Sequence, residues 1–129
     1  MNNSLIGILQ KRMDKCTTEQ FWAVAVITGL CALVVTQKSS LVNAIPIWVI
    51  LTTFVIIACY GVFYVLDRHM TYHRNAQDLV SLIQDFPDCP ERMKRVPDPL
   101  KLRSFTGSAF YLLWICGATI VSFTILLCE

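Results

Sequence analysis

The alternation of apolar and charged segments divides the chain into three long hydrophobic runs separated by charged blocks. The runs cover residues 17–37, 41–66 and 104–128, and Glu19 is the only charged residue inside them. A helix of about 17–25 apolar residues is long enough to cross the hydrocarbon core of a bilayer. The pattern therefore predicts three transmembrane helices. Buried helices of a soluble protein are disfavoured, because three such runs would leave almost no polar surface to cover them.

The second run is longer than a bilayer requires, and its helical pattern continues beyond it. Pro46 predicts a late start, because proline is tolerated in the first turn of a helix and Asn43 can cap it there. Apolar residues then recur at helical spacing until Pro87, which ends the helix. We expect the second span to extend into the cytoplasm as residues 67–86. Residues 87–103 would follow as a proline-rich basic return.

Residues 1–16 carry an amphipathic pattern of their own. Apolar and charged residues alternate there at helical spacing, with Leu5, Ile8, Leu9 and Met13 on one side and Lys11, Arg12, Asp14 and Lys15 on the other. Such a pattern is typical of a short helix that lies in the membrane interface. We expect this helix to precede the first span.

Composition supports a membrane protein of one domain. Hydrophobic residues make up 55% of the 129 residues, and only 16% are charged, whereas a soluble domain has about 25% charged residues. A chain of this length accommodates a single domain. The predicted fold class is therefore all-α, with three transmembrane helices, an extended second helix and an N-terminal amphipathic helix.

The distribution of positive charge predicts the orientation. If the chain alternates sides at each span, Lys38 is the only one of the 11 Lys and Arg residues on the side opposite the N-terminus. Lys and Arg accumulate on the cytoplasmic side of membrane proteins. We therefore expect an integral plasma (inner) membrane protein with its N-terminus in the cytoplasm and its C-terminus outside.

Small and hydroxyl-bearing residues form stripes on two of the spans, at Ala25, Thr28, Gly29, Ala32 and Thr36 in the first and at Ser104, Ser108 and Ser122 in the third. Two interpretations stay open. The stripes line a narrow pore, or they let helices pack closely, as small residues do in membranes. Three spans make too small a bundle to enclose an aqueous path, so a pore would require a homo-oligomer.

The densest basic cluster consists of Arg92, Lys94, Arg95, Lys101 and Arg103, inside the predicted return. It has three interpretations: contact with anionic lipid headgroups, binding of an anionic ligand such as a nucleotide, or docking on an acidic protein partner. No specific nucleic-acid binding is assigned.

Enzymatic activity is not expected. The interiors of the spans lack the ionisable groups that proton-coupled transporters and membrane-embedded enzymes require. No P-loop, glycine-rich nucleotide turn, Ser-His-Asp set or C-x-x-C pair occurs. His69 and His73 stand four residues apart, but no third ligand follows at a recognisable spacing, so we interpret them as helix-surface histidines at headgroup level. We expect neither a metal nor a cofactor.

Two function classes remain. The first is a homo-oligomeric membrane protein that forms a channel or a membrane-permeabilising pathway, gated from its cytoplasmic helix and basic return. Its layout is similar to that of small bacterial membrane effectors that damage the inner membrane when a phage or nucleotide signal arrives. That similarity is one of architecture and rests on no motif. The second class is a non-catalytic membrane-anchor or adaptor subunit of a larger complex.

Overall fold

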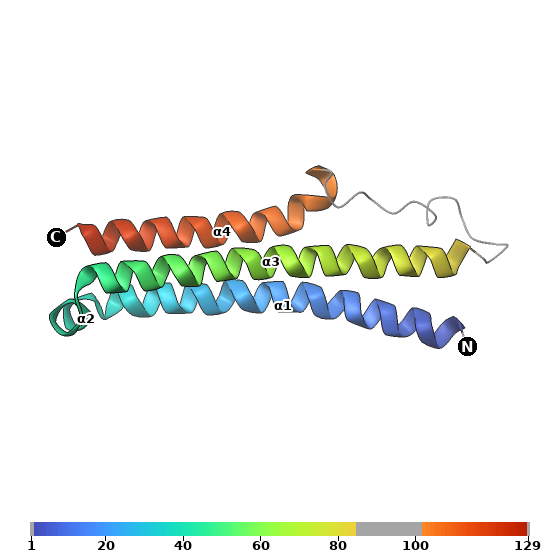
Figure 1. Cartoon of the computed structure of the whole chain (residues 1–129), viewed down its shortest axis with the longest axis horizontal. Helices are drawn as coiled ribbons and strands as arrows, with labels where there is room; N and C mark the ends of the chain where they lie inside the picture. The colour runs from blue at the N-terminus through green and yellow to red at the C-terminus, as the bar shows by residue number, and fades with distance from the viewer. Residues whose placement is uncertain (1, 85–101, 129) are drawn as a thin grey trace.

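The computed structural model describes residues 2–84 and 102–128, and among these the side chains of residues 4–84 and 107–128. The described parts contain only helices and the turns between them: α1 (Asn2–Thr36), α2 (Lys38–Ala44), α3 (Ile47–Gln84) and α4 (Leu102–Leu127). Helices α1 and α3 run antiparallel, and α4 lies along both (Figure 1). The N-terminus and the end of α3 lie at one end of the bundle. Helix α2 and the C-terminus lie at the other (Figure 1).

Three of these helices are long and apolar enough to cross a membrane: Ser4–Thr36, Ile47–Gln84 and Gly107–Leu127. The prediction of an all-α protein with three such helices is confirmed. At 1.5 Å per residue, the longest helices α1 and α3 measure roughly 50–57 Å, well beyond a hydrocarbon core of about 30 Å. Both helices must therefore project from the bilayer.

Both long helices continue beyond the predicted spans. Residues 1–16 were expected as a distinct helix, but α1 continues from Asn2 to Thr36 without a break. Similarly, α3 passes from the predicted second span through the predicted extension as far as Gln84. The expected stop at Pro87 and the basic return lie outside the described residues.

Pro46 separates α2 from α3. Its ring disfavours helical geometry in the preceding residue, and Ile45 is accordingly extended, with φ −134° and ψ 136°. Helix α3 then begins at Ile47, which is the late start that the proline predicted. The expected capping role of Asn43 is wrong, because Asn43 lies inside α2, whose last residue is Ala44.

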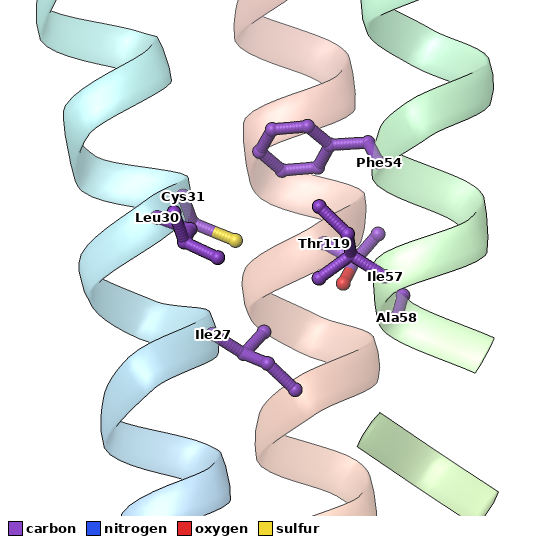
Figure 2. A pocket seen from close by; sticks show the side chains of 7 residues that line it. All are labelled: Ile27, Leu30, Cys31, Phe54, Ile57, Ala58 and Thr119. Carbon is purple, nitrogen blue, oxygen red and sulfur yellow. The ribbon is translucent and has the colours of Figure 1, made fainter. Parts of the chain in front are cut away.

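A narrow apolar core joins the three long helices. It is formed by the buried residues Ile27 and Cys31 of α1, Phe54 and Val65 of α3, and Ile115 of α4. The cavity at its centre measures only about 10 Å³ (Figure 2), roughly the volume that a single water probe needs. The core of a single copy is therefore closely packed.

Most large apolar side chains point outward instead. Phe63 of α3 and Leu113 of α4 are each 73% exposed, and Tyr60 is 70% exposed. Apolar surface on this scale marks contact with membrane or protein partners. Here it lies on the helices that are long enough to span, so lipid is the natural environment of this surface.

Lys38 of α2 caps the C-terminal end of α4. Its Nζ donates to the carbonyl oxygen of Ile125 at 2.9 Å and also to that of Cys128. The last carbonyls of a helix have no partner within the helix, and the helix dipole places partial negative charge there. Lys38 is the one basic residue predicted on the side of the membrane opposite the others, and these hydrogen bonds give it a structural role.

Candidate functional site

A layer of buried polar side chains joins all three long helices about midway along α1 and α3 and close to the start of α4. Ser108 of α4 donates a hydrogen bond from Oγ to Oε1 of Gln20 on α1, at 3.2 Å. His69 of α3 lies with Nδ1 2.9 Å from the same Oγ. Which of these two groups donates depends on the ring nitrogen of His69 that carries the proton. All three residues are buried.

The helical repeat of α3 explains why His69 is buried. Buried positions along this helix are separated by four or seven residues, at Ile50, Phe54, Gly61, Val65, His69 and His73. The two histidines continue the stripe that begins in the apolar core. Their interpretation as helix-surface residues is wrong: they are only 4% and 5% exposed, and their ring centroids lie 4.6 Å apart.

A charged cluster lies beside this layer. Arg68 on α3 binds Glu19 of α1 at 3.1 Å and its neighbour Asp67 at 2.9 Å. Its guanidinium also lies 5.3 Å from the ring centroid of Tyr64, within range of a cation–π contact. Glu19, the only charge within the predicted spans, is therefore paired where α1 and α3 meet. Lys15 forms a second, longer ion pair with Glu19, in which Nζ and Oε1 are 3.7 Å apart.

The seam between α1 and α4 is an open groove. At the end with the polar layer it is lined by the polar side chains of Thr17, Gln20, His69, Tyr72, His73, Ser108 and Tyr111, with Phe21, Gly107 and Phe110. Further along it is lined by Thr28, Cys31, Ala32, Phe110, Leu113, Trp114, Gly117, Ala118, Val121 and Ser122. Phe110 lines both parts, and the hydrogen bond between Trp114 and Thr28 crosses the seam within the second part.

No protein family, curated protein or solved structure matches this chain. Its function therefore has to be argued from the geometry of the described residues.

The stripe predicted on α1 faces away from the core of the bundle. Gly29, Ala32 and Thr36 are exposed, and Ala25 and Thr28 are half-buried. A Cβ placed on Gly29 would have no neighbouring atom within 4 Å. Thr28 differs from the others, because its Oγ1 accepts a hydrogen bond from Nε1 of Trp114 on α4 at 3.0 Å.

The stripe predicted on the third span is divided. Ser108 belongs to the buried layer, and Ser122 is also buried, with its hydroxyl bonded to the carbonyl of Ala118 in its own helix at 2.8 Å. The groove brings Ser122 together with Thr28 and Ala32 of the first stripe. Two further predicted site residues, Ser104 and Arg103, lie in α4, but their side chains are not described. The remaining basic residues of the cluster, Arg92, Lys94, Arg95 and Lys101, lie outside the described residues.

The Ser108–His69 pair lies in the buried layer with Gln20, which accepts a hydrogen bond from the Ser108 hydroxyl. The geometry suits a hydrogen-bonded link between helices. Among the described side chains, no group of three or more His, Cys, Asp or Glu could hold a metal ion.

The sequence interpretation missed Gln20 and the role of His69. A signal for both was present, because His69 and His73 follow Val65 at the spacing of the buried stripe. Gln20 is the last strongly polar residue before the apolar body of the first span. Its partner Ser108 could not be identified, since nothing in one sequence sets the vertical register between helices.

Proposed function

We propose that the protein is a homo-oligomer of the plasma membrane whose copies surround a permeation pathway, gated from the cytoplasmic face. In this proposal the end of the bundle with the N-terminus lies at the cytoplasm, and the C-terminus lies outside. The role is that of a small membrane effector, which damages the membrane barrier when a signal arrives.

The observation that carries the proposal is the bare face of α1. Small residues follow one another there at Ala25, Gly29 and Ala32, and no atom of the described residues would lie within 4 Å of a Cβ added to Gly29. Helices associate in lipid through close contact at small residues, because lipid removes the hydrophobic force between them. A helix of a second copy can approach closely at this face.

The packing of a single copy supports a pathway between copies. The central cavity of about 10 Å³ is lined almost entirely by apolar side chains such as Ile27, Phe54 and Ile57. Such a cavity neither conducts nor holds a column of water. A pathway formed by several copies avoids this obstacle, and hydroxyls such as that of Thr36 then contribute to its lining.

In this proposal α3 transmits the gating signal to the bundle. This helix extends from the apolar core to Gln84, so a signal bound at its far end can bias the bundle between two arrangements. The basic residues Arg92, Lys94 and Arg95 are the proposed contact for an anionic ligand or partner. Replacing all three with Gln should remove the response to the signal while leaving insertion intact.

The test of the proposal measures dye leakage from liposomes that contain the purified protein. Gly29→Leu should abolish leakage and lower the yield of oligomer, because leucine fills the space that a second helix would occupy. It should not unfold the single copy, since nothing in the chain lies within 4 Å of the added Cβ.

Val26→Leu is the control, because Val26 is equally exposed but lies off the stripe, on the side that faces α3. This variant should leak like the unmodified protein. Equal leakage from both variants would exclude the α1 face as the interface. An unmodified protein that is monomeric and never leaks would favour a membrane-anchor or adaptor subunit instead.

A further inference from the structure

The polar end of the α1–α4 groove lies at the level where a membrane changes from water to hydrocarbon. The charged cluster of Glu19, Asp67 and Arg68 stands directly before the charge-free parts of α1 and α3. Gln20 and His69 are the adjoining residues, and they line the groove. Lipid headgroups occupy this level of a bilayer.

The polar end is rich in hydrogen-bond donors and has no acid among its described lining residues. Tyr72 and Tyr111 line it together with the buried Ser108. The hydrogen bond from Ser108 uses the amide oxygen of Gln20 and so leaves its NH₂ group as a donor. Glu19 lines a different groove, between α1 and α3, and is paired with Arg68. Such a set complements phosphate oxygens, which only accept hydrogen bonds.

The remainder of the groove is suited to a hydrocarbon chain. Beyond Phe110 its walls are mainly apolar and include Leu113, Trp114 and Val121. Gly117 leaves this part open, because a Cβ added there would have no neighbour within 4 Å. The donors at one end and the apolar channel at the other match the two halves of a phospholipid in their order across a bilayer.

We infer that the groove between α1 and α4 binds one glycerophospholipid. The phosphate group occupies the polar end, beside Gln20, Ser108 and the two tyrosines, and an acyl chain lies along the apolar part. The apolar part of this site shares Ala32 with the bare face of α1, but no residue that lines its polar end belongs to that face, so the polar end can be tested without the permeation pathway.

The test uses the full chain reconstituted into phosphatidylglycerol vesicles and extracted in mild detergent. Native mass spectrometry then counts the phospholipid molecules that remain on each chain. The unmodified chain should retain one. The double variant Tyr72→Phe/Tyr111→Phe should retain it about tenfold less well, because it loses two donors to the phosphate but keeps both rings.

The control is Tyr60→Phe/Tyr64→Phe, which makes the same chemical change in the α1–α3 groove and should retain the lipid fully. Gly117→Leu tests the apolar part independently and should also lose the lipid. Equal retention by the two double variants would overturn the inference, as would an unmodified chain that retains no lipid. Displacement of the lipid by inorganic phosphate alone would assign the site to a free anion and would also overturn it.

Discussion

At the scale of single residues, two glycines of similar sequence context have opposite surroundings. Gly61 of α3 is buried, and a Cβ added to it would collide with Cδ1 of Ile27 and lie 3.7 Å from Cδ1 of Ile115. Gly29 of α1 is exposed, with nothing within 4 Å. Gly61 is therefore required where α1 crosses α3, whereas Gly29 is free of any such requirement inside one copy.

This difference predicts the outcome of placing leucine at each position. Gly61→Leu should lower the free energy of unfolding relative to Gly29→Leu by about 1–3 kcal/mol, because it overpacks the core around Ile27. Both substitutions gain about 1 kcal/mol of helix propensity, so this contribution cancels in the comparison. Unfolding by SDS, followed by circular dichroism, measures the difference. Equal stability would show that Ile27 can move aside without cost.

Ser108 and Ser122 form a second matched pair, since both are buried serines of α4. Ser108→Ala removes a link to two other helices and leaves Gln20 and His69 without that partner, at a cost of about 1–3 kcal/mol. Ser122→Ala removes only a bond within α4 and should cost less than about 1 kcal/mol. The same SDS titration compares them. A larger loss for Ser122→Ala would contradict the assigned role of the polar layer.

At the scale of helices, sequence patterns predicted more about each element than about how elements meet. The apolar runs located three helices, because length and hydropathy alone decide which segments can span a bilayer. Pro46 correctly marked the start of α3. The register between helices was not accessible, because it depends on side chains far apart in sequence, such as Gln20 and Ser108. The burial of His69 followed from the helical repeat, but polar character favoured the surface interpretation.

The end of α4 yields a prediction about Lys38. Lys38→Gln should lower stability by about 0.5–1 kcal/mol, because it removes a positive charge from the C-terminal end of a helix dipole. Lys15→Gln is the control: its contact with Glu19 is 3.7 Å long and its side chain is 74% exposed, so its effect should be near zero. Equal effects of the two variants would mean that Lys38 does not cap α4.

At the scale of the whole molecule, three spanning helices predict that the two termini lie on opposite sides of a membrane. The charge asymmetry predicts that the N-terminus is the cytoplasmic one. A reporter that is active only in the cytoplasm should work when fused at Met1 or within residues 88–101, and should fail after Glu129. Reporter activity at both termini would place both in the cytoplasm, and one of the three helices would then not span the membrane.

The central claim is that several copies assemble around a pathway, and the most direct measurement is the density of the purified protein in lipid nanodiscs, viewed along the membrane normal. The account predicts a ring of copies in which the α1 faces at Gly29 contact the neighbouring copy and a continuous path runs through the centre. A single bundle surrounded by lipid on all sides would contradict it.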